Sequence, residues 1–212
     1  MRLLDELRAE HTLIDRALGA LRTWVEQGGA AEDGLRFFHF FKRYAGDFHH
    51  AREEDSLFAG LHREAELPLD RGPVAVLTAD HHRLGALLDQ LHPLLRDAER
   101  GPRMTELAIA YSRGLWVHLD AENSVLLPES AQRLRRLNIH ELPSRAPTAQ
   151  ELAALHDGED LVARYPELVD RVVMRGDGCI MCPAYGVSCR GLEREWWTDN
   201  DWSEHPDRFT GD

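Results

Sequence analysis

The sequence predicts an all-α fold, namely an up-down-up-down four-helix bundle followed by a C-terminal extension that is mostly helical or irregular. Two observations support this prediction. Four segments repeat apolar residues at the three- and four-residue spacing of an amphipathic helix. Short connections rich in glycine and proline separate them, which suits antiparallel neighbours. We expect the bundle over residues 1–142 and the extension over residues 143–212.

The first segment carries an unbroken apolar stripe from Leu4 to Val25 and ends at the Gln27-Gly28-Gly29 sequence. One polar residue, His11, occupies a slot on this stripe. A buried histidine needs a partner for its ring nitrogens, so this position is a candidate metal ligand as well as a candidate core residue.

The second segment contains two overlapping His–x3–Glu pairs, His49 with Glu53 and His50 with Glu54. Its buried face is defined by Phe37, Phe41, Tyr44 and Phe48. On an α-helical wheel His49 lies about 100° from Phe48, whereas His50 lies about 200° away. We therefore favour His49 and Glu53 as ligands. We place His50 and Glu54 behind the ligands or on the surface, with Glu54 as an alternative bridging ligand.

The third and fourth segments repeat this arrangement. His81 interrupts the apolar stripe between Leu77 and Leu95, and this helix is expected to stop or kink at Pro93. In the fourth segment, His118 and Glu122 both fall on the apolar seam. Glutamate is costly to bury unless it is paired or bound to a metal.

A lone histidine followed about forty residues later by a His–x3–Glu pair thus occurs twice in the chain. Residues four apart leave one face of a helix. Imidazole and carboxylate groups from four helices can surround two metal ions in a bundle core, and they suit iron, manganese and zinc. We expect two iron ions as the cofactor, with Mn or Zn as alternatives. The expected ligands are His11, His49, Glu53, His81, His118 and Glu122.

These motifs resemble the signature of the hemerythrin-like, HHE-type cation-binding domains. That family has a His on helices one and three and a His–x3–Glu pair on helices two and four. The pair on helix two precedes a Leu-Phe-Pro-like turn, and the similar turns here are Leu57-Phe58-Ala59 and Leu126-Leu127-Pro128. The resemblance covers roughly residues 1–142. It implies an up-down-up-down bundle and, usually, a di-iron centre.

The chain departs from the oxygen-carrying hemerythrins at two places. They have a second His one turn after the helix-three ligand, where this chain has Gly85. They also have a longer His-to-Asp spacing on helix four. The resemblance therefore does not extend to simple reversible oxygen carriage.

Two functions are compatible with these features. One is a protein that binds or senses O2, NO, redox state or iron. The other is a di-iron oxidoreductase that acts on peroxide, NO or an organic substrate. A cavity beside the metals, opened at Gly85, would favour the enzyme, and a closed pocket sized for a diatomic would favour binding. The sequence contains no motif for an organic cofactor.

Several residues near the predicted ligands are candidates for supporting roles. Glu10 and Asp80 each precede a ligand, and Asp15 lies one turn past His11, so each could accept a hydrogen bond from an imidazole. Surface charge is the alternative interpretation of all three. Tyr111 lies two turns from His118 on the same face. It is interpreted as a core residue, with a redox or oxygen-bonding role as the alternative.

Composition limits the partners. The net charge of −12 argues against nucleic acid and anionic membranes as main partners. No apolar run approaches the roughly 18 residues that a membrane span needs. The chain starts directly with an acidic amphipathic segment and has three cysteines, from which we expect a cytoplasmic protein.

The extension changes in character after Leu142. Pro143 and Pro147 suggest a linker, and the sequence from Thr148 to Glu151 predicts a capping box that opens a short helix. The tail is expected to pack across the bundle or to recruit a protein partner. Its notable residues are Trp196, Trp197, Trp202 and a candidate zinc or redox group of Cys179, Cys182 and Cys189, with His205 as a further zinc ligand. Since all predicted ligands precede Leu142, a chain ending there is expected to keep its metals.

Overall fold

The computed structural model describes residues 1–168, and the predictions about the cysteines and tryptophans lie outside these residues. Secondary structure in this part is entirely helical. The α-helices are α1 (Arg2–Gln27), α2 (Glu32–His39), α3 (Ala59–Ala65), α4 (Gly72–Arg96), α5 (Pro102–Ala121), α6 (Leu127–Arg136) and α7 (Ala149–Arg164). Three π-helical segments occur among them, namely η1 (Phe40–His50), η2 (Glu53–Phe58) and η3 (Glu122–Leu126).

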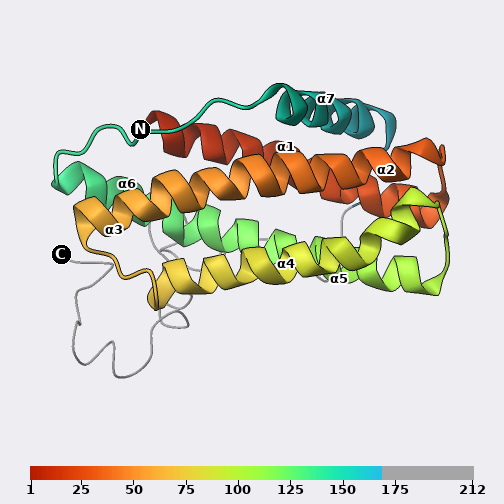
Figure 1. Cartoon of the computed structure of the whole chain (residues 1–212), viewed down its shortest axis with the longest axis horizontal. Helices are drawn as coiled ribbons and strands as arrows, with labels where there is room; N and C mark the ends of the chain where they lie inside the picture. The colour runs from red at the N-terminus through yellow and green to blue at the C-terminus, as the bar shows by residue number, and fades with distance from the viewer. Residues whose placement is uncertain (169–212) are drawn as a thin grey trace.

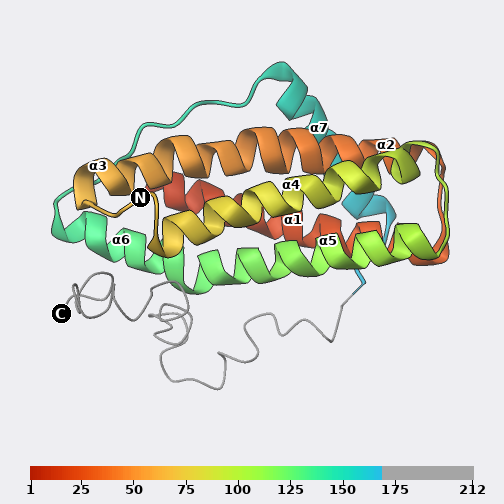
Figure 2. The same cartoon turned by 60° about the horizontal axis from the view of Figure 1, so that its bottom comes forward.

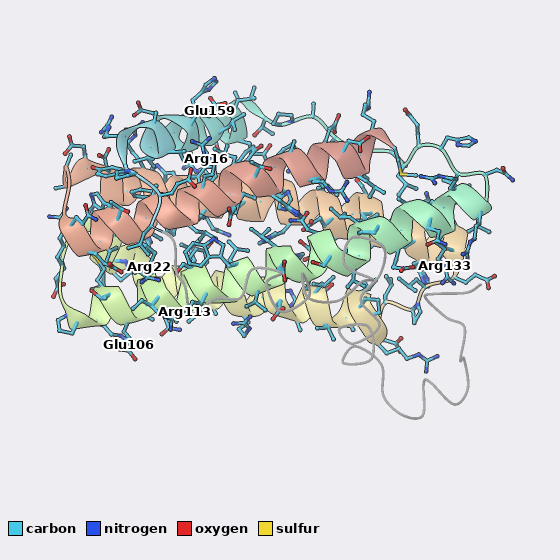
Figure 3. The ribbon with its side chains drawn as sticks, turned by 180° about the vertical axis from the view of Figure 1, so that it is seen from behind. Arg16, Arg22, Glu106, Arg113, Arg133 and Glu159 are labelled. Carbon is cyan, nitrogen blue, oxygen red and sulfur yellow. The ribbon has the colours of Figure 1, made fainter. Side chains whose placement is uncertain are left out.

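These segments form four long rods. The first is α1, the second joins α2, η1, η2 and α3, the third is α4, and the fourth joins α5, η3 and α6. Consecutive rods run in opposite directions and lie side by side in both views (Figures 1 and 2). From behind, α1 lies between α5 and α7 (Figure 3), and it contacts both helices. The predicted all-α bundle is confirmed.

The rods end where the sequence predicts, with one exception. Gly28 closes α1 with a φ of 88°, a conformation that suits glycine. Of the two expectations at Pro93, a stop or a kink, the stop does not occur, because the helix α4 continues to Arg96. Pro93 lies in the last turn, where its missing N–H removes few helical hydrogen bonds. Leu91 and Leu95 are fully buried there, so packing holds the last turn in place.

The core consists of two apolar clusters with polar residues between them. One cluster includes Ile14, Phe48 and Leu84, and the other includes Leu7 and Leu57. In each rod the predicted ligands fall between a residue of one cluster and a residue of the other; His11, for example, lies between Leu7 and Ile14. Apolar layers therefore enclose the polar centre at both ends of the bundle.

A seventh α-helix covers the bundle outside the four rods. The predicted capping box is present, because the Thr148 hydroxyl accepts a hydrogen bond from the N–H of Glu151 and the Glu151 carboxylate accepts one from the N–H of Thr148. The helix α7 packs on α1, α2 and η1, and its buried Leu161 joins the core together with Tyr165, which directly follows the helix. The Tyr165 hydroxyl donates a 2.6 Å hydrogen bond to the buried carboxylate of Asp33.

None of the helices in the described part of the chain is long and apolar enough to cross a membrane.

Candidate metal centre

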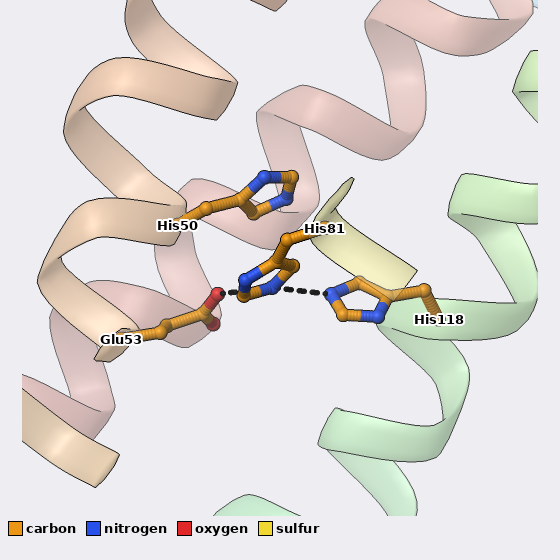
Figure 4. Close-up of side chains that lie close together, drawn as sticks. All are labelled: His50, Glu53, His81 and His118. Carbon is orange, nitrogen blue, oxygen red and sulfur yellow. Dashed lines mark hydrogen bonds and ion pairs between the residues drawn. The ribbon is translucent and has the colours of Figure 1, made fainter. Parts of the chain in front are cut away.

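All six predicted ligands lie together in the middle of the bundle, and His50 joins them. Two groups of donor atoms form, each with its atoms within 4.8 Å of one another. The residues of the first group, here called position A, are His11, His49, Glu53 and Glu122. Those of the second group, position B, are His50, Glu53, His81 and His118 (Figure 4). Glu53 belongs to both, as expected of a carboxylate that bridges two ions.

His50 lies among these donor atoms, although the α-helical wheel placed it behind the ligands or on the surface. Its side chain is buried and not on the surface. The reason is that His49 and His50 close the π-helical segment η1. A π-helix has more residues per turn than an α-helix, so consecutive residues are separated by a smaller angle. Two adjacent histidines can then face the same interior. The doubled His–x3–Glu pair was the signal for this arrangement.

The other π-helical segments also carry metal-competent residues. Glu53 begins η2 and Glu122 begins η3. Single π-helical turns occur frequently at functional sites because they redirect side chains at some cost in helical regularity. In this protein they occur where two rods must direct carboxylates and imidazoles to one point.

The donor atoms are spaced as ligands of shared ions. The Nε2 atoms of His11 and His49 each lie 3.4 Å from Oε1 of Glu53, and Nε2 of His81 lies 3.4 Å from Oε2 of the same carboxylate. Two ligands held about 2.1 Å from one ion are roughly 3.0–3.4 Å apart in octahedral or tetrahedral geometry. Glu53 thus presents one oxygen to each position.

Glu122 joins the two positions from the opposite rod. Its Oε2 lies 3.3 Å from Nε2 of His11 and 3.4 Å from Nε2 of His118. The Nε2 atoms of His81 and His118 are themselves 3.1 Å apart (Figure 4). The distances therefore support a compact site for two ions with carboxylates between them.

Hydrogen bonds on the outer ring nitrogens orient three of the imidazoles. Nδ1 of His49 bonds to Glu10 at 2.7 Å, Nδ1 of His81 to Glu54 at 2.6 Å, and Nδ1 of His11 to the amide oxygen of Asn123 at 2.9 Å. A proton on Nδ1 leaves the Nε2 lone pair free to point inward, which is the tautomer that a metal requires.

Of the three carboxylates predicted to accept a hydrogen bond from an imidazole, Glu10 does so at close distance. Glu10 accepts the bond from His49, whereas Asp80 comes only within 3.7 Å of Nδ1 of His118. Asp15 contributes its backbone carbonyl to Trp116. Sequence reasoning missed Asn123, which directly follows Glu122 and has no charge to draw attention to it.

The buried polar atoms are consistent with bound cations. Glu53 and Glu122 are fully buried, and neither pairs with a lysine or arginine of residues 1–168. Nε2 of His49, Nε2 of His50 and both carboxylate oxygens of Glu122 have no hydrogen-bond partner. Carboxylates in an apolar core without a permanent positive charge beside them are strongly unfavourable. Two divalent ions would satisfy these atoms, so the residues fit such a centre.

Protons replace these cations in a metal-free centre. Burial lowers the pKa of His11, but the carboxylates of Glu122 and Glu53, 3.3 and 3.4 Å from its Nε2, outweigh this effect and raise the pKa to about 10. The pKa of His81 also rises to about 10, against burial, because of Glu53 and Glu54. Burial and the nearby His81 hold the pKa of His50 well below its usual value, so that ring is neutral. Metals and protons therefore compete for the same nitrogens.

A cleft of about 600 Å³ opens beside position B. His50, His81, Gly85 and Tyr111 line it, together with apolar residues such as Phe41. A Cβ atom placed on Gly85 would meet nothing within 4 Å, so glycine contributes to the opening. The buried Tyr111 packs edge-on against Phe41 at 5.3 Å between ring centres, which confirms its place in the core.

Taken together, a helical bundle with buried histidines and carboxylates around two adjacent positions defines a cation-binding protein. The comparison with protein families agrees, because the model of the hemerythrin HHE cation-binding domain matches residues 2–130. The chain belongs to this family. Neither the comparison with curated proteins nor the one with solved structures gave a significant match.

Proposed function

We propose that this protein holds two iron ions, one at each position, and uses them to bind or sense a small ligand such as O2 or NO, or the redox state or iron level. The observation that carries the proposal is the carboxylate of Glu53, whose two oxygens face different groups of imidazoles. Iron in such surroundings would supply reversible one- and two-electron chemistry. Manganese and zinc suit the same donors and are the alternatives.

The residues of the chain would each contribute to this function. The imidazoles of His11, His49, His81 and His118 and the ring of His50 would supply neutral ligands, and Glu53 and Glu122 would offset the ionic charge. The apolar layers on both sides would exclude water from the centre. The net charge of −12 makes small ligands better candidates than nucleic acid. A cytoplasmic location, based on the few cysteines, is part of the proposal.

Metal analysis of protein purified without oxygen tests the proposal. We expect about two iron ions per chain and an oxo-to-Fe(III) absorption band after exposure to air. A matched variant, Glu53→Gln, should lower the uptake at both positions because one carboxylate serves both. Uptake of one ion, or of zinc alone from an iron-rich culture, would refute the di-iron assignment.

A di-iron oxidoreductase is the second candidate, and the cleft beside position B favours it. A volume of about 600 Å³ exceeds what a diatomic ligand needs and can admit peroxide or a small organic substrate. We expect Gly85→Phe to fill the opening and slow azide binding, followed by visible absorption, without a change in metal content. Repeated turnover of a substrate would establish the enzyme, whereas saturable binding without product would favour the sensor.

A further inference from the structure

The arginine Arg52 lies buried just outside position A and links three parts of the chain. Its Nη1 and Nη2 atoms donate to the carboxylates of Glu10 and Glu6 on α1, and its Nε donates to the Ser144 hydroxyl at 2.8 Å. Its guanidinium also lies 4.8 Å from the centre of the Phe48 ring. A buried arginine with all sides engaged is held in one orientation.

Glu10 connects Arg52 to the metal centre. One of its oxygens accepts from Arg52, and the other accepts from Nδ1 of His49 at 2.7 Å. A continuous chain of contacts therefore runs from Ser144 through Arg52 and Glu10 to a predicted ligand of position A. Groups that hold the outer nitrogen of a ligating histidine change metal affinity by about 10- to 100-fold.

The linker before α7 contacts the C-terminal end of η1, close to His49 and His50. Arg145 donates to the backbone carbonyl of Asp47 at 2.6 Å and lies 5.1 Å from the centre of the Phe48 ring, the ring that Arg52 also contacts. Two further bonds, of 2.7 and 2.8 Å, tie Arg145 to Glu151 in the capping box of α7. Asp47 and Phe48 directly precede the adjacent histidines His49 and His50.

The outer nitrogens of position B are supported more weakly. Asp80, which accepts from Arg83, lies 3.7 Å from Nδ1 of His118, and its side chain is 29% exposed. The outer nitrogen of His81 bonds to Glu54, whose side chain is 37% exposed and pairs with no arginine in the described part of the chain. Ser144 and Arg145 moreover lie beyond residue 130, where the match to the family ends. The contact between the linker and the centre is thus a property of this chain's extension.

We propose that Ser144, Arg145 and Arg52 form a positioning device, here called the linker clamp, that holds His49 and tightens metal binding at position A relative to position B. The proposal rests on the proposed dinuclear function. It makes the two positions unequal, with a firmly held ion at A and a more exchangeable ion at B, beside the cleft. The extension can therefore influence the centre without supplying a ligand.

Stepwise anaerobic titration of the full chain with Co(II), followed by its visible d–d absorption and by competition with a chelator, tests the clamp. We expect Arg52→Met and the double variant S144A/R145M to weaken one of the two binding steps 10- to 100-fold and to alter the spectrum of that ion. Arg52→Lys should recover part of the affinity because it keeps a charge beside Glu10.

The matched control is Arg164→Met. Arg164 also joins the extension to the bundle, through Asp33, but it takes no part in the contacts around His49. This variant should lower the melting temperature and leave both binding steps unchanged. Clamp variants that titrate like Arg164→Met would overturn the proposal. If Arg52→Met does not fold by circular dichroism, the double variant decides. A wild-type chain that takes up fewer than two ions would instead refute the proposed function.

Discussion

At the scale of single residues, neighbouring histidines in one helix have different surroundings. The outer nitrogen of His49 bonds to Glu10, whereas the ring of His50 stacks on His81 with 4.0 Å between ring centres. His50 borders the cleft and His49 does not. The environment of each ring, rather than its residue type, therefore determines which ion it can serve.

The role of His50 leads to the first prediction. His50→Ala should reduce metal uptake from about two ions to about one, because it removes a donor from position B only. His49→Ala should reduce uptake through position A. The control is His82→Ala, because His82 lines the same cleft but is exposed. Metal analysis of the purified variants checks this, and normal uptake by His50→Ala would restore the earlier assignment of His50 outside the ligand set.

The second prediction concerns the pH dependence of the metal-free protein. The pKa values of His11 and His81, about 10 in the folded chain, lie above the ordinary value of 6.5. Their protonation contributes to the free energy of unfolding. This contribution is fully present below about pH 6.5 and is lost as the pH rises towards 10. The melting temperature of metal-free protein should fall across this interval, and that of loaded protein should fall less.

A variant separates these histidines from other titrating groups. Metal-free His11→Gln should show a smaller fall in melting temperature between pH 7 and pH 10, because its side chain does not titrate. Metal binding at pH 8 should also release protons, measurable by calorimetry in buffers of different ionisation enthalpy. Binding without proton release would contradict the assigned charge state.

At the scale of elements, the bundle depends on close contacts between specific helices. Gly34 of α2 faces α4 so closely that an added Cβ would lie 2.1 Å from the backbone oxygen of Leu95. Gly85 lies in the middle of α4 with open space around it. Both residues are helical glycines, but only Gly34 is required by packing.

This contrast gives the third prediction. Gly34→Ala should lower the free energy of unfolding by about 1–3 kcal/mol, because α2 and α4 must move apart. Gly85→Ala should raise it by up to about 1 kcal/mol, since alanine favours the helix more than glycine does and meets no neighbour. Urea unfolding of both variants checks this. If both substitutions changed the free energy of unfolding equally, helix propensity and not packing would determine the effect.

At the scale of the whole molecule, α7 shares the core of the bundle. It contributes buried Ala154, Leu161 and Val162, and Tyr165 follows directly after it. Gly158 lets the ring of Phe40 approach the backbone of α7. The sequence alone predicted that a chain ending near Leu142 would keep its metals. The packing of α7 indicates that such a chain would lose part of its core and the linker clamp as well.

The fourth prediction compares two truncated chains. A chain ending at Leu168 should bind two ions and keep the bundle's stability. A chain ending at Leu142 should lose roughly 4 kcal/mol or more of unfolding free energy, because each large apolar side chain contributes about 1.5–3 kcal/mol when buried. It should also bind one ion less tightly. Circular dichroism melts and metal titration measure both, and equal stability of the two chains would contradict the role of α7.

The sequence by itself determined the four amphipathic rods, most of their ends, the capping box of α7, the four polar residues that interrupt apolar stripes and the His–x3–Glu pairs of the second segment. These features are local, since helical periodicity and the cost of burying an unpaired polar group can be read from neighbouring residues. The same reasoning identified Glu10 as a candidate partner for an imidazole because it precedes His11, but only the packing of two rods made His49 its partner.

Only the tertiary structure decided the rest. It placed His50 inside, because the π-helical turns of η1 change the angle between residues in a way that no α-helical wheel anticipates. It extended α4 beyond Pro93 to Arg96, because Leu95 is buried against its neighbours. It brought Ser144 to Arg52, which lie 92 residues apart in the chain, because α7 folds back over the first two rods. Contacts of this range depend on how whole helices pack, and no local pattern specifies them.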